Sequence, residues 1–99
     1  MTWYNNRLTV IGAPIRLRSF LKTKWATPLG AKHCELLENS PRRFACQFES
    51  DNPPLEPIRR LSRRWPGLIF LIDYEGEQQR IMGLVKADAG RIVSCQFDY

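Results

Sequence analysis

The chain has 99 residues, a net charge of +5, 43% apolar residues and 25% charged residues. This balance predicts one folded domain over residues 1–99 and excludes a disordered tail. There is no apolar leader and no run of about 18 apolar residues, so neither export nor membrane insertion is expected. Three cysteines are an odd number for a disulfide framework, and the expected location is the reducing cytoplasm.

Charge is distributed unevenly along the chain. Residues 1–34 contain six Lys and Arg and no acid, whereas residues 66–99 contain five acids and three bases. Such asymmetry favours an anionic partner, and it is equally typical of a soluble domain with charged helices.

The first third predicts a strand followed by an amphipathic helix. Residues 7–11 alternate around Leu8 and Val10 and end in β-branched residues, which is typical of a strand. Pro14 suits the first turn of a helix, and this helix is expected to end near Lys24. Its polar face carries four bases, Arg16, Arg18, Lys22 and Lys24.

The middle of the chain predicts a β-hairpin. Residues 44–48 alternate regularly, residues 38–41 supply turn-forming residues, and residues 33–37 are a weaker strand candidate. Whether residues 26–42 contain a second strand is left open by this pattern.

A second helix is expected after the hairpin and before Pro66-Gly67. Its N-cap is predicted at Asp51 or Asn52, because these side chains can accept a hydrogen bond from the first turn. The apolar face contains Ile58, Leu61 and Trp65, and the remainder carries Arg59, Arg60, Arg63 and Arg64.

Three strands are predicted in the last third. Residues 68–72 are a continuous apolar run typical of a central strand, and residues 80–86 form its return strand after a turn at residues 75–77. Residues 91–99 alternate again as a final strand. Cys46 and Cys95 are in phase with apolar neighbours in their strands, so both are expected in the core.

The element order predicts an α+β fold. Strand, helix, strand, strand, helix, strand is the ferredoxin-like split βαβ plan. A C-terminal β-meander would extend the sheet to about six strands, with both helices on one face of the antiparallel sheet. The expected strand order is second, third, first, fourth, fifth, sixth.

Two blocks of residues carry a family resemblance. The opening block consists of Trp3, Asn6, Leu8, Val10 and Gly12. The second consists of Pro53-Pro54, Ile58, Leu61, Trp65-Pro66, Leu68, Phe70, Tyr74 and Gly83. In order and spacing these blocks resemble the YubB-type ferredoxin-like domains, small proteins of bacterial plasmids, phages and other mobile elements. The chain departs from that pattern in the short middle between Trp25 and Arg42. The resemblance implies a fold and a mobile-element setting, and it brings no activity or site residues.

The first functional hypothesis is nucleic-acid binding. RNA-recognition domains use a four-stranded split βαβ sheet and stack bases on aromatics of its central strands. Here Arg43 and Cys46 replace a glycine and an aromatic of their motif, and residues 7–11 contain no aromatic. The hypothesis therefore rests on a basic helical layer able to contact phosphates. A solvated helix face explains the same residues, which are Arg16, Arg18, Lys22, Lys24, Arg59, Arg60, Arg63 and Arg64.

The second hypothesis is a protein-interaction or homo-oligomerisation module. Exposed edges of an extended sheet allow strand addition, and the final strand with Phe97 and Tyr99 is the expected edge. The alternative is an ordinary edge protected by Arg91 and Asp98. The expected partners are therefore nucleic acid, a second copy or another protein, and no membrane.

An enzyme or metal site is not favoured. His33 and Cys34 are adjacent in a candidate strand, where neighbouring side chains point to opposite faces. The chain contains no paired ligands at zinc-site spacing and no phosphate-binding glycine loop. We therefore expect no catalytic residue, no metal and no cofactor.

Overall fold

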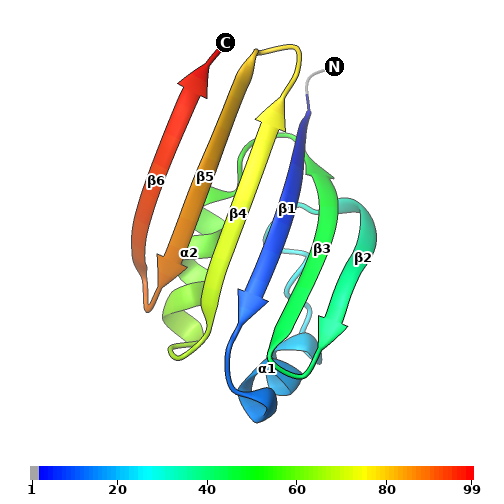
Figure 1. Ribbon diagram of the computed structural model, residues 1–99, viewed down its shortest axis with the longest axis vertical. Helices are drawn as coiled ribbons and strands as arrows, with labels where there is room; N and C mark the ends of the chain where they lie inside the picture. The colour runs from blue at the N-terminus through cyan, green and yellow to red at the C-terminus, as the bar shows by residue number, and fades with distance from the viewer. Residues whose placement is uncertain (1–2) are drawn as a thin grey trace.

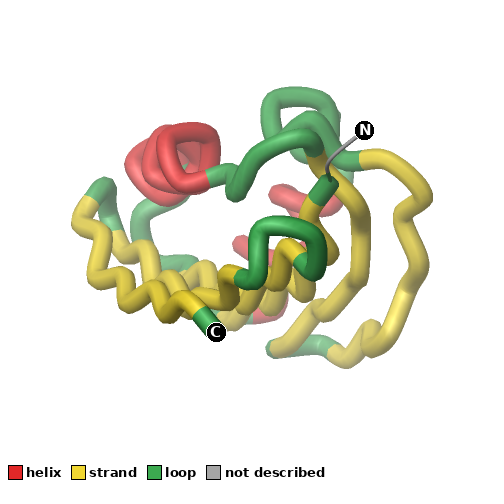
Figure 2. The backbone as a smooth tube through the Cα atoms, turned by 90° about the horizontal axis from the view of Figure 1, so that it is seen from above, coloured by secondary structure: helices red, strands yellow, loops and turns green. Residues whose placement is uncertain are grey.

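Six antiparallel strands form one sheet, and two helices pack on one of its faces in the computed structural model, which describes residues 3–99 (Figures 1 and 2). The order across the sheet is β2-β3-β1-β4-β5-β6, so β2 and β6 are the edges. Among residues 3–99, no helix has the length and apolar character needed to cross a membrane. The strands are β1 (Tyr4–Ile11), β2 (Lys32–Ser40), β3 (Arg43–Ser50), β4 (Ile69–Gly76), β5 (Ile81–Asp88) and β6 (Arg91–Asp98). The helices are α1 (Pro14–Leu21) and α2 (Leu55–Arg64).

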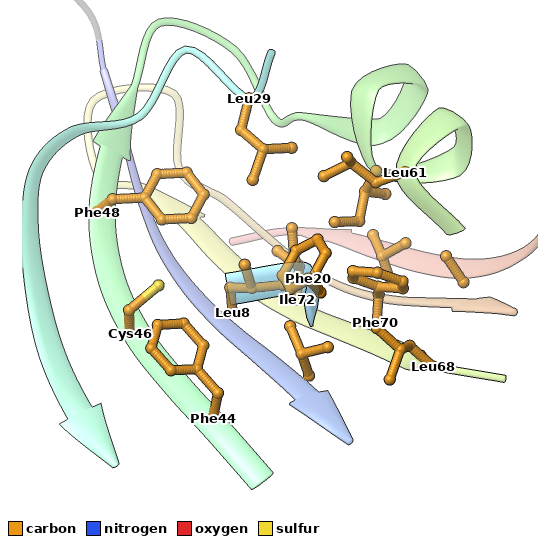
Figure 3. Packing of buried hydrophobic residues seen from close by; sticks show 14 of the residues in the cluster. Leu8, Phe20, Leu29, Phe44, Cys46, Phe48, Leu61, Leu68, Phe70 and Ile72 are labelled. Carbon is orange, nitrogen blue, oxygen red and sulfur yellow. The ribbon is translucent and has the colours of Figure 1, made fainter. Parts of the chain in front are cut away.

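The core lies between the helices and the face of the sheet that they cover. Leu8 and Val10 of β1 point into it, and the register of β1 with β3 and β4 aligns alternate residues of all three strands on this face. Phe20 of α1 is fully buried and lies 5.3 Å, centroid to centroid, from the ring of Phe70 on β4 (Figure 3). The α+β class with two helices and a six-stranded antiparallel sheet, expected from the sequence, is confirmed.

The first helix is shorter than predicted. It ends at Leu21 instead of near Lys24, with Lys22 as its C-cap. The Thr23 hydroxyl donates a hydrogen bond to the carbonyl of Phe20 at 2.7 Å, and the Thr23 amide donates to the same oxygen. The chain therefore turns away from the helix axis at this point.

The predicted cap of the second helix is wrong. Pro54 is the N-cap residue of α2, and its side chain has no hydrogen-bonding atom. Asp51 instead forms an ion pair with Lys32 at 3.2 Å, and the carbonyl of Asn52 accepts a hydrogen bond from the Ser50 hydroxyl at 2.6 Å. Both candidate residues thus belong to the connection from β3.

The second strand exists and is longer than its weak pattern indicated. It pairs with β3 along Lys32–Ser40, with shifts of register between Lys32 and Glu35 and between Leu36 and Glu38. Its residues are exposed on both faces, apart from half-buried Ser40. A strand without a buried face has no apolar alternation to reveal it.

Tyr74 fixes β4 to the far edge of the sheet. Its ring crosses Gly83 of β5, and its hydroxyl donates to the Gln96 side chain of β6 at 2.7 Å. A Cβ atom at position 83 would lie 2.3 Å from Cζ of Tyr74. Glycine is therefore required at this position for the ring to lie over β5.

Candidate functional site

The basic helical layer consists of α1, the turn that follows it and α2. Residues 14–24 and 55–64 hold eight bases and a single acid, Glu56. Since the whole chain has 15 bases and 10 acids, the remainder has seven bases and nine acids. The positive charge of this protein is thus concentrated in the layer that covers one face of the sheet. Its bases are all those predicted, namely Arg16, Arg18, Lys22, Lys24, Arg59, Arg60, Arg63 and Arg64, and all are exposed except the half-buried Arg59.

Arg16 connects the two helices of the layer. Its Nη2 atom donates to the carbonyl of Pro66 at 2.8 Å, and its guanidinium lies 5.2 Å from the centre of the Trp65 ring. Since Trp65 and Pro66 directly follow α2, this contact holds the end of α2 against α1. Arg16 therefore has a packing role that the sequence pattern did not indicate.

Arg16→Ala is expected to lower the free energy of unfolding by about 1 kcal/mol, because the substitution removes a cation–π contact and a hydrogen bond at a partly exposed position. Arg18→Ala is the matched control, since it removes the same charge from an exposed position of the same helix. Urea unfolding of both variants measures the difference. Equal stability of the two would contradict a packing role for Arg16.

The remaining bases of α2 have different surroundings. Arg59 forms an ion pair with Glu56 at 3.5 Å, and it is the one base of the layer for which residues 3–99 show an acidic partner. The side chain of Arg63 runs beside Gly90 in the turn between β5 and β6. Arg60 and Arg64 are exposed and one helical turn apart, so they are available to an external anion.

The other face of the sheet is not covered by a helix and contains two adjoining hollows of about 350 and 440 Å³. Both are lined by Arg7, Asp73 and Leu84. Arg7 and Asp73 are directly opposite each other in neighbouring strands, so the charge here is mixed. A mixed surface of this kind has no preference for a polyanion.

Bases cannot stack on the central strands β1 and β3, because the aromatic side chains of these strands point toward the helix-covered face. Phe44 and Phe48 of β3 are buried in the core on the helix-covered face. On the open face, the residues of Tyr4–Ile11 and Arg43–Ser50 include no aromatic side chain. The layer of helices, and not the sheet, is therefore the candidate nucleic-acid surface.

The three cysteines do not form a site. Cys46 is buried, and this burial raises the pKa of its thiol to about 12, so the thiol stays protonated. Cys95 was expected in the core and this expectation is wrong, because it lies exposed on the open face of β6. Within residues 3–99 no three His, Cys, Asp or Glu side chains are close enough to hold a metal, and His33 and Cys34 are exposed on β2.

The open face also holds an apolar strip that the sequence pattern did not reveal. Met82 and Leu84 of β5 and Val93 and Phe97 of β6 are large apolar residues exposed on this face. Alternation shows that such residues share one face of a strand, but it does not show which face the helices cover.

Comparison with known proteins adds no functional assignment to this geometry. No protein-family model, curated protein or solved structure matches the chain. The strongest indication of function is therefore the distribution of charged and apolar residues over the two sides of the domain. Positive charge is gathered on the helix-covered side, and the opposite side combines mixed charge with exposed apolar residues.

Proposed function

We propose that this domain is a non-catalytic binding module whose basic helical layer contacts the phosphates of nucleic acid. The observation that carries the proposal is the separation of charge: eight bases against one acid in the layer, and seven against nine elsewhere. Each phosphate neutralised by Lys or Arg releases counterions, and this release drives sequence-independent binding.

The side chains of the layer support this function because most of them are exposed and uncommitted. Arg60 and Arg64 lie one turn apart on α2, and Arg18 and Lys22 have the same spacing at α1. A guanidinium offers several donors in one plane and suits phosphate oxygens. Binding should therefore depend on backbone phosphates and show little preference for base sequence.

We also propose a ferredoxin-like plan and a kinship with the YubB-type domains. This plan is supported by the order β2-β3-β1-β4, in which β1 lies between β3 and β4, and β5 and β6 would extend it as a meander. Close packing explains two glycines of the resemblance, since Cβ atoms at Gly12 and Gly83 would overlap Leu68 and Tyr74. A bacterial mobile-element setting and a cytoplasmic location, supported by three free cysteines, are part of this proposal.

The test measures binding of labelled single-stranded DNA, double-stranded DNA and RNA by fluorescence anisotropy at low salt. Arg60→Glu/Arg64→Glu is expected to weaken binding at least about tenfold, because it removes two phosphate contacts and adds repulsion. The matched control, Arg7→Glu/Lys86→Glu, changes the net charge equally on the open face and should retain most of the binding.

Two results would overturn the proposal. Absence of binding by the unaltered protein to all three nucleic acids would leave the layer as a solvated helix face. Equal weakening by both double variants would show a response to net charge without a defined surface.

A further inference from the structure

The two edges of the sheet differ in how they are protected. β2 is interrupted by two register shifts, contains His33 with a φ of 55°, and carries charges at Lys32, Glu35 and Glu38. β6 pairs with β5 without interruption from Arg91 to Asp98, carries charges only at these two end residues, and contains no proline or lysine. Bulges, lysine and proline are the usual means of preventing strand addition. β6 therefore lacks the protection that β2 has.

An exposed apolar strip leads to this unprotected edge. Met82 faces Phe97 and Leu84 faces Cys95 across the β5–β6 pair, and Val93 continues the strip. Val93 is 72% exposed, Leu84 57% and Phe97 53%. Isolated apolar residues are normal on a protein surface, whereas contiguous ones are typical of interaction sites.

The backbone of β6 has its free hydrogen-bonding groups at alternate residues. The two-residue turn at Ala89 and Gly90 makes Asp88 and Arg91 a hydrogen-bonded pair, and the Tyr99 amide donates to the carbonyl of Arg80 at 2.8 Å. Odd-numbered residues of β6 are therefore bonded to β5. The amides and carbonyls of the even-numbered residues, Ile92, Ser94, Gln96 and Asp98, point outward from the sheet.

We propose that β6 pairs with β6 of a second copy, antiparallel, about a two-fold axis that passes midway between the two copies of Cys95. A two-fold axis perpendicular to the sheet places residues of the same face opposite each other, so the residue at the centre of the pairing must face its own copy. Centring on Cys95 lets the outward groups of Ile92 bond to Asp98 of the second copy, and those of Ser94 bond to Gln96 of the second copy. This proposal goes beyond nucleic-acid binding and does not depend on it.

Side chains are complementary in this register. On the open face, Val93 meets Phe97 of the second copy, so the two apolar strips become continuous. On the other face, Asp98 meets Ile92 of the second copy, which lies two residues after Gly90. Because Arg63 runs beside Gly90, each acidic strand end approaches an arginine of the other copy. Because the pattern is self-complementary, a second copy of this chain matches it, whereas a strand of another protein would need a matching sequence.

The neighbouring register, centred on Ser94, is less favourable. It places Arg91 opposite Phe97 of the second copy and leaves Asp98 outside the paired segment. Val93 would meet Cys95 of the second copy, and the strips would overlap less. The proposed register is therefore the one that uses the whole strand.

Cys95 supplies a direct test of the register. At the centre it faces Cys95 of the second copy as a non-hydrogen-bonded pair, with Cα atoms about 4.5 Å apart, which is within disulfide range. Diamide oxidises the two thiols, which lose two protons and two electrons as the S–S bond forms, and is itself reduced to the hydrazine. Cross-linked dimer is then measured by non-reducing electrophoresis.

The full chain is compared as variants that each have one exposed thiol. Cys34→Ser leaves Cys95 as the exposed thiol, Cys95→Ser leaves Cys34, and Cys34→Ser/Cys95→Ser/Val93→Cys moves the thiol by two residues, while Cys46 stays buried. Cross-linking through Cys95 should be at least about tenfold faster than through either other position, because a held pair reacts as an intramolecular one. Sedimentation should give a dimer mass for the unaltered protein and a monomer mass for the folded Val93→Lys variant.

Three outcomes would overturn the proposal. These are equal cross-linking through Cys34 and Cys95, faster cross-linking through position 93, and a monomer mass for the unaltered protein at all concentrations. Circular dichroism of Val93→Lys checks that it folds, and if it does not, the cross-linking rates and the mass of the unaltered protein decide between these outcomes.

Discussion

Phe20→Ala is expected to lower the free energy of unfolding by about 3–5 kcal/mol, the largest loss that a single substitution should cause in this protein. Phe20 is fully buried, and its ring lies 5.9 Å from Trp25, 5.6 Å from Trp65 and 5.3 Å from Phe70. The cavity left by the ring would separate α1 from the sheet and from the end of α2. Three aromatic neighbours cannot all move inward to fill it.

Urea unfolding followed by tryptophan fluorescence measures this loss, because Trp25 and Trp65 report on the same cluster. The control is Ile15→Ala in the same helix, where the side chain is 76% exposed and the expected change is within about 0.5 kcal/mol. A loss below about 1 kcal/mol for Phe20→Ala would contradict the central position of its ring in the core.

Gly83→Ala is expected to cost about 1–3 kcal/mol, although alanine is normally better than glycine in a strand. The added Cβ would lie 2.3 Å from Cζ and 2.4 Å from the hydroxyl oxygen of Tyr74. The ring must then leave the sheet surface, and its hydrogen bond to Gln96 is lost. β6 would lose its side-chain connection to β4.

A double-mutant cycle separates this steric cause from any general effect of the substitution. In a Tyr74→Ala background the ring is absent, so Gly83→Ala should be neutral or slightly stabilising. The same cost in both backgrounds would contradict the account of Tyr74 over Gly83. Thermal or urea unfolding gives the free energy of unfolding of each of the four proteins.

The elements with one buried face were predictable because burial leaves a period in the sequence. β1, β3 and β4 alternate or are continuously apolar, and α2 repeats its apolar residues at helical spacing. β2 was harder to predict, since both of its faces are exposed. The start of α2 was missed because Asp51 serves as the partner of Lys32.

The sequence pattern does not show that Cys46 is buried and Cys95 exposed, since both alternate with apolar neighbours. Two helices cover only one face of a six-stranded sheet, and β6 presents its odd-numbered residues to the uncovered face. Cys46 is buried under the helices, and Cys95 is exposed with Val93 and Phe97. Which face of a strand the helices cover depends on the register of its pairing, and alternation alone does not determine that register.

The members of the basic layer were predictable because a polar helix face opposite an apolar one must point outward. The packing role of Arg16 was not predictable, because its partners Trp65 and Pro66 lie 49 and 50 residues further along the chain. Pairing of β6 with a second copy would place both α2 helices on the same face of a joined sheet. The basic layers of two copies would then form one larger surface for a polyanion.

The dependence of nucleic-acid affinity on salt shows whether the basic helical layer contacts phosphates. A plot of log K against log salt concentration has a slope set by the number of phosphates contacted. Arg60→Ala/Arg64→Ala should make that slope shallower by about two, one for each phosphate contact removed. Arg7→Ala/Lys86→Ala on the open face should leave the slope unchanged. The same slope for the unaltered protein and the Arg60/Arg64 variant would contradict binding through the basic helical layer.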